Sequence, residues 1–170
     1  DWGELYGELF RPTAYLQQYI DDCKQGLGEE YVAVHLRFMN LLGDKTEFDS
    51  DPTLPRAEQE SLTMRALASL REVMQRNCGK RILLATDSAT FVERVRREQP
   101  EVRFIPGEIR HIGTAQHTSD GAVVKMFVDY YMIAGAERVY NLVGPGMWPS
   151  AFPEYAAKIG RCPFERISFK

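Results

Sequence analysis

Apolar, strand-like runs alternate with helix-like segments along most of this chain, and the segments between the runs are long enough to hold helices. Short apolar runs bounded by turn residues predict strands, and apolar residues spaced three and four apart predict helices. The predicted strands are 31–37, 81–87, 101–106, 137–143 and 164–169. The predicted helices are 13–26 (capped by Thr13 and stopped by Gly26), 56–77, 88–99 (capped by Asp87 or Ser88), about 120–135, and 151–160.

This order predicts an α/β fold, a Rossmann-like parallel sheet with helices on both faces. The length of 170 residues fits a single domain, 1–170, in which residues 1–30 form a leading helical segment. In such folds, ligands bind at the carboxyl ends of the strands. The residues that follow each strand are therefore the first place to look for a site.

Composition narrows the class of partner. The net charge of −3 offers no basic face for nucleic acid, and no run approaches the ~18 apolar residues of a membrane helix. Three unpatterned cysteines (Cys23, Cys78 and Cys162) predict free thiols rather than a disulfide framework. Free thiols and the lack of a visible signal peptide favour the bacterial cytoplasm over a secretory lumen.

Polar residues cluster after the predicted strands. His35 and Arg37 end the first strand on one face, because strand side chains alternate. Asp87 and Ser88 follow the second strand, and Ser150 precedes a helix whose N-terminal N–H groups attract anions. A guanidinium matches phosphate oxygens, and a carboxylate can accept hydrogen bonds from a guanine edge. Together these groups predict a site for a nucleotide diphosphate.

Other nucleotide folds are less well supported. The chain has neither a GxxxxGK[ST] phosphate loop nor a GxGxxG turn after a strand. His111 and His117 lie six residues apart in a loop, which is poor spacing for a metal site, and no metal is expected.

Each residue also has a structural interpretation. Arg37 can pair with Asp44 or Glu47, His35 can be a buried sheet histidine, and Asp87 can cap the following helix. Lys125 and Asp129 can form a surface ion pair, because they lie four residues apart on a predicted helix. The aromatic rings of Tyr130, Tyr131 and Trp148 can serve only for packing.

Three blocks of the sequence, in order, resemble the fucosyltransferase superfamily, the α1,2, α1,6 and protein O-linked enzymes that use GDP-fucose. The first is VAVHLR, with the strand that ends in His-x-Arg. The second is ILLATDSATFVERVRREQPEVRFI, and the third runs from DGAVVKMF through GPGMWPSAF to AAKIG. The resemblance covers residues from about 30 to 160. It implies one half of a GT-B glycosyltransferase, the C-terminal domain that binds the donor.

The resemblance also implies roles. Arg37 would contact the donor diphosphate and stabilise the leaving GDP, with His35 beside it. Asp87 would read the guanine edge with Ser88 next to it, and Ser150 would lie near the phosphates. Fucose would pass from GDP-fucose, or another GDP-sugar, to a glycan or protein acceptor by inverting transfer without a metal. The acceptor-binding N-terminal domain has no counterpart here, so we expect the chain to be part of a larger enzyme.

Two alternatives stay open at this point. One is a catalytically silent module that binds a nucleotide or sugar, which the loop 38–55 and the altered turn 144–150 allow. The other is a different Rossmann-like enzyme with Asp87 as acid or nucleophile, although the DxD of aspartate-nucleophile phosphatases is absent.

Overall fold

A computed structural model of the 170-residue chain describes residues 1–44, 52–107 and 120–170. Its core is a four-stranded parallel sheet in the order β2-β1-β3-β4. The strands are β1 (Tyr31–Leu36), β2 (Arg81–Thr86), β3 (Arg138–Val143) and β4 (Phe164–Ser168). The helices are α1 (Trp2–Leu9), α2 (Ala14–Leu27), α3 (Arg56–Arg76), α4 (Ala89–Glu98), α5 (Asp120–Ala134) and α6 (Phe152–Gly160).

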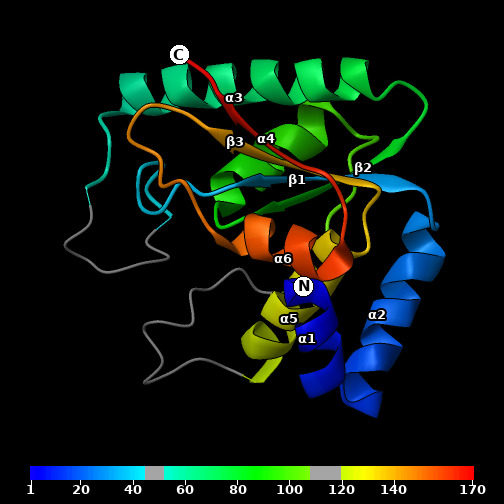
Figure 1. Ribbon diagram of the computed structural model, residues 1–170. Helices are drawn as coiled ribbons and strands as arrows, with labels where there is room; N and C mark the ends of the chain where they lie inside the picture. Colours follow the sequence, from blue (N-terminus) through cyan, green and yellow to red (C-terminus); the bar gives the residue numbers. More distant parts are fainter. Residues whose placement is uncertain (45–51, 108–119) are drawn as a thin grey trace.

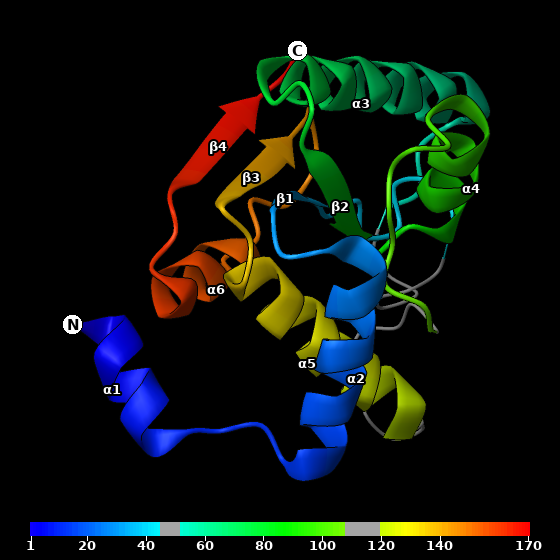
Figure 2. The ribbon, with the colours of Figure 1, turned by 90° about the vertical axis from the view of Figure 1, so that its right-hand side faces the viewer.

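The sheet is the middle layer of a three-layer sandwich (Figures 1 and 2). Helices α3 and α4 cover one face, and α2, α5 and α6 cover the other, with α1 outside α5 and α6. Strand alternation divides β1 accordingly: Val32, Val34 and Leu36 pack against α3 and α4, whereas Tyr31 and Ala33 pack against α2 and α5. The prediction of a parallel sheet with helices on both faces is confirmed.

Two local predictions need correction. Residues 101–106 were expected to form a strand, but only Arg103 joins the sheet, through an isolated bridge to Leu83. The reason is that Pro100 and Pro106 flank this bridge and have no N–H group for a longer ladder. Helix α2 continues past Gly26 and ends at Leu27, and its C-cap is Gly28, whose positive φ of 84° suits a helix terminus.

The N-terminal caps are now resolved. Thr13 caps α2 as predicted, and Ser88, not Asp87, caps α4, because the Ser88 hydroxyl accepts the Phe91 N–H at 3.0 Å. Helix α1 was expected only as part of the leading helical segment 1–30, and Asp1 begins it through a capping box with Glu4.

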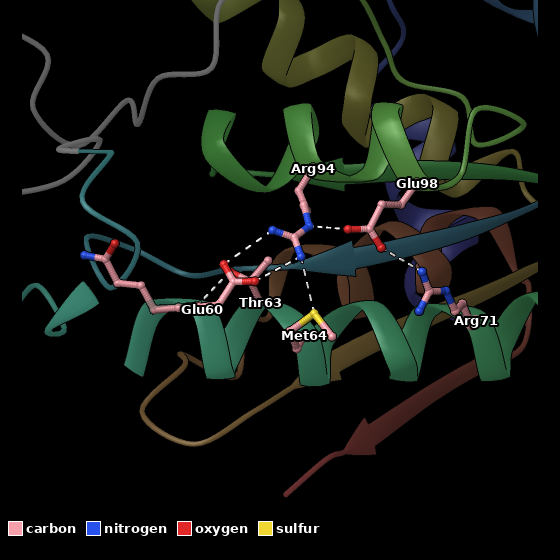
Figure 3. A network of polar contacts seen from close by, with 7 residues as sticks. Glu60, Thr63, Met64, Arg71, Arg94 and Glu98 are labelled. Carbon is pink, nitrogen blue, oxygen red and sulfur yellow. Dashed lines mark hydrogen bonds and ion pairs between the residues drawn. The ribbon is translucent and has the colours of Figure 1, made fainter. Parts of the chain in front are cut away.

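Ion pairs hold α4 against α3 (Figure 3). Arg94 lies at the centre, with hydrogen bonds to Glu98 on its own helix and to Glu60 on α3, the latter at 2.9 Å. Arg71 of α3 reaches the other oxygen of Glu98 at 2.8 Å. These bonds fix the orientation of α4, and therefore of its first residues, which border the site described below.

None of the helices in the described part of the chain has the length and apolar content that crossing a lipid bilayer requires. All three cysteines are free, as predicted.

Candidate functional site

The strand order reverses between β1 and β3, and the region between the carboxyl ends of these two strands is named the β1–β3 crevice. From β1 the chain moves outward to β2 and then returns across β1 to β3 and β4. The connections on either side of this point therefore cover opposite faces, and in open α/β sheets ligands bind where the order reverses. His35 and Arg37 lie on the β1 side, and Ser150 follows β3.

His35 is a buried, neutral imidazole. It lies opposite Asn141 of β3, and its ring centroid is 5.9 Å from that of Phe152 at the start of α6. Burial lowers the pKa of His35 to about 4; interaction with the Asn141 side chain opposes this shift, and the Arg37 cation adds to it. Nδ1 of His35 and Oδ1 of Asn141 are buried and make no hydrogen bond with described residues. His35 can thus serve a ligand as a neutral hydrogen-bonding group.

We expect NMR of the His35 ring to show a neutral imidazole down to about pH 5, with protonation only near pH 4. The folded-state pKa lies below the ordinary value of 6.5, so the unfolded chain takes up this proton first. His35 therefore lowers the free energy of unfolding as the pH falls from about 6.5 to about 4. A ring that titrates near 6.5 in the folded chain would contradict this burial.

Arg37 lies one residue beyond β1 and is half-buried. Its positive charge lowers the pKa of both His35 and Asp87, because it lies near both groups. The alternative partner Asp44 bonds elsewhere: its oxygens accept hydrogen bonds from the Ser88 hydroxyl at 2.5 Å and from Thr90 N–H at 2.9 Å. Glu47, the other suggested partner, lies outside the described residues.

Asp87 and Ser88 make contacts within the chain. The two carboxylate oxygens of Asp87 accept the N–H groups of Phe38 and Met39, each at 2.8 Å. Ser88 is fully buried and bonds to Asp44 and to the Phe91 N–H. Asp87 therefore supports the backbone after Arg37, and its predicted role as a guanine reader stays a prediction.

Ser150 follows β3 and lies just before α6, across the crevice from His35. It is buried, its carbonyl oxygen accepts Asn141 Nδ2 at 3.1 Å, and its hydroxyl accepts the Phe152 N–H at 3.3 Å. The structure thus joins Ser150 to His35 through Asn141 and Phe152. Asn141 was not predicted as a site residue, because the sequence alone does not show which strand lies beside β1.

The aromatic residues divide into two groups. Tyr131 shares a hydrogen bond with Tyr6 at 3.0 Å, and the Tyr130 ring lies 5.1 Å from that of Phe152, so both pack as expected. Trp148 does not: 57% of it is exposed, in the loop between β3 and α6.

A cavity of about 970 Å³ lies between α2, α5 and residues 103–107, on the side of the sheet that His35 faces. It was not predicted. Its walls include Tyr15, Tyr19, Cys23, Leu83, Phe104 and Lys125.

Lys125 bonds to Asp129 at 2.5 Å, and their side chains are only 10% and 15% exposed. The pair was expected at the surface, and it is buried instead. Burial raises the pKa of Asp129, although Lys125 opposes the shift, and Oδ1 of Asp129 makes no hydrogen bond with described residues. The spacing of four residues was the available signal, but it does not reveal which face of α5 is covered. The loop histidines His111 and His117 lie outside the described residues, and within them no three acidic, histidine or cysteine side chains group around a possible metal ion.

The fold of this chain matches one half of the GT-B fold found in solved structures of fucosyltransferases. NodZ from Bradyrhizobium matches with a TM-score of 0.59 and 19% identity, over 91% of this chain and 44% of that one. NodZ α-1,6-fucosyltransferase co-crystallized with GDP matches with a TM-score of 0.56 and 20% identity, over 85% of this chain and 41% of that one. The apo form of POFUT1 matches at 0.53 and 13% identity, over 98% of this chain and 49% of that one.

These matches show the fold. The chain spans somewhat under half the length of each structure, as expected for one of the two GT-B domains. The sequence itself matches no protein-family model and is significantly similar to no curated protein.

Proposed function

We propose that this chain is the donor-binding half of a glycosyltransferase that uses a GDP-sugar, with GDP-fucose as the first candidate. The observation that carries the proposal is that His35 and Arg37, at the end of β1, lie at the same edge of the sheet as Ser150, which follows β3 and bonds to Asn141 opposite His35, in a fold shared with fucosyltransferases. Among the structures with this fold, NodZ was co-crystallized with GDP and soaked with GDP-fucose.

In this proposal Arg37 binds the donor diphosphate. A guanidinium donates two parallel hydrogen bonds to phosphate oxygens, and its charge is most valuable where negative charge develops on the departing GDP. The start of α6 adds the partial positive charge of a helix N-terminus beside Ser150, although the Phe152 N–H is bonded to the Ser150 hydroxyl and Pro153 has no N–H group. His35, neutral at pH 7, contributes a hydrogen bond rather than a charge.

The nucleoside is assigned to the cavity between α2 and α5. Leu83 in its wall pairs with Ala33, which lies two residues before His35 on the same face of β1. The cavity therefore lies on the side of the sheet from which His35 and Arg37 project. A volume of about 970 Å³ falls in the range of small-molecule and cofactor pockets.

Sugar transfer also needs an acceptor, a glycan or a protein, which we assign to a second domain. The share of NodZ and POFUT1 that this chain spans supports this division. The isolated chain is then expected to bind nucleotide and to transfer sugar poorly.

Calorimetric titration of the chain with GDP, and with UDP and ADP as controls, tests the proposal. We expect GDP to bind more tightly than the other two. Equal binding of all three, or of none, would count against a GDP-sugar donor site. If GDP binds and the native protein releases no GDP from GDP-fucose with any acceptor, the catalytically silent module becomes the better description.

A further inference from the structure

The backbone directly after Arg37 has an unusual conformation. Met39 has a φ of 55°, in the left-handed region that residues other than glycine seldom adopt. The N–H groups of Phe38 and Met39 point to the same carboxylate, that of Asp87, with one bond to each oxygen. Successive N–H groups around a left-handed residue form a concavity that binds an anion. In this chain the bound anion is the carboxylate of Asp87, the residue directly after β2.

A second carboxylate ties the far end of the same loop. Asp44 accepts hydrogen bonds from the Ser88 hydroxyl and from both the N–H and the hydroxyl of Thr90. Residues 38–44 are thus attached twice to the junction of β2 and α4, once near each end. Helix α4 also contacts α3, through the Arg94–Glu60 ion pair and through its buried residues Phe91 and Val95.

We propose that Asp87 is a positioning residue that holds the loop behind Arg37 and so aims the Arg37 guanidinium at a diphosphate in the β1–β3 crevice. The consequence for ligand binding rests on the proposed function. The anchoring of the loop does not, since it follows from the contacts of Asp87 alone. This role differs from reading a guanine edge, because both oxygens of the carboxylate bond to the backbone.

The anchor requires an ionised carboxylate. A protonated carboxyl group would present an O–H donor to one of the two N–H groups, and that hydrogen bond would be lost. Burial raises the pKa of Asp87 to about 6, while the N–H groups of Phe38 and Met39, the Arg37 cation and its own backbone N–H oppose the shift. Besides Arg37 at the end of β1, the charged residue of the described part that lies at this junction is Asp44, bonded to Ser88.

The effect of pH on the anchor differs from its effect on stability. The folded-state pKa of Asp87 lies above the ordinary value of 3.8, so protonation of Asp87 favours the folded chain. The contribution of Asp87 to the free energy of unfolding is therefore lost as the pH rises through about 6. Acidification to pH 5 loosens the loop without destabilising the chain through this residue.

The experiment compares the chain with Asp87→Asn, and with Asp21→Asn as a control that removes an exposed carboxylate from α2. Amide NMR of the chain is expected to show the Phe38 and Met39 resonances shifting with a midpoint near pH 6. In Asp87→Asn this transition is absent and both amides exchange with solvent at least tenfold faster. Amides with unchanged exchange in Asp87→Asn would overturn the anchoring.

Titration with GDP and UDP at pH 7.5 tests the link to Arg37. Asp87→Asn is expected to lower the affinity for both nucleotides by the same factor, at least tenfold, whereas Asp21→Asn is expected to change neither affinity. Loss of GDP affinity with UDP unchanged would overturn the proposal in favour of base reading. If the unmodified chain binds neither nucleotide, the proposed function fails, and the amide measurements still decide whether Asp87 anchors the loop.

Discussion

Arg37→Ala is expected to lower the affinity of the chain for GDP at least about a hundredfold, equivalent to about 3 kcal/mol. The guanidinium is the cation at the crevice in the proposed site, and its loss leaves the diphosphate charge without its main partner. Arg37→Lys keeps the charge but not the planar pair of donors, so an intermediate affinity is expected. Calorimetry with GDP at one fixed ionic strength measures all three variants.

The matched control is Arg76→Ala, which removes the same charge from the other edge of the sheet. Arg76 ends α3, is half-exposed, and pairs with Glu165 near the start of β4. GDP affinity is expected to stay unchanged in this variant. If the two alanine variants bind GDP equally well, Arg37 does not bind the diphosphate, and the donor-site proposal loses its central residue.

Gly160→Ala is expected to destabilise the fold by about 3 kcal/mol or more. Helices α5 and α6 approach so closely at their C-terminal ends that a Cβ on Gly160 would lie 1.8 Å from the carbonyl oxygen of Ala134. The obstacle is backbone, which cannot rotate away as a flexible side chain can. The helices would have to separate, and the apolar contacts of α6 with the sheet would weaken. Urea denaturation followed by circular dichroism measures the loss.

Gly7→Ala is the control for this prediction. Gly7 lies within α1, and a Cβ there would meet no atom within 4 Å. Alanine in a helix is favoured over glycine by about 0.5–1 kcal/mol, so this variant is expected to be as stable as the unmodified chain or slightly more stable. A Gly160→Ala chain that unfolds at the same urea concentration as Gly7→Ala would show that α5 and α6 can separate without cost.

Much of the fold was predictable because it depends on local patterns. Apolar runs and helical spacing placed all four strands and five of the six helices that the described residues form, since these patterns arise from neighbours along the chain. The exceptions have local causes as well. Residues 101–106 are apolar enough for a strand, but the prolines at 100 and 106 confine pairing to Arg103.

The candidate site was predictable only in part. His35 and Arg37 share a face because side chains of a strand alternate, and both precede a loop at the carboxyl edge. The contacts that define their surroundings join distant residues: Asp87 with Phe38 and Met39, and Asn141 with Ser150. No spacing in the sequence predicts such pairs, because they depend on which strands become neighbours in the sheet.

The sequence by itself determined the class of fold, the parallel direction of the strands and the fact that His35 and Arg37 project from the same side of β1. These follow from the order of elements and from strand periodicity. Only the tertiary structure decided that β3 lies beside β1, that Asp87 holds the loop after Arg37, and that Lys125 and Asp129 are buried as a pair. The reason is that burial and long-range hydrogen bonds are settled when the layers pack together, and a residue's own neighbours in sequence do not specify that contact.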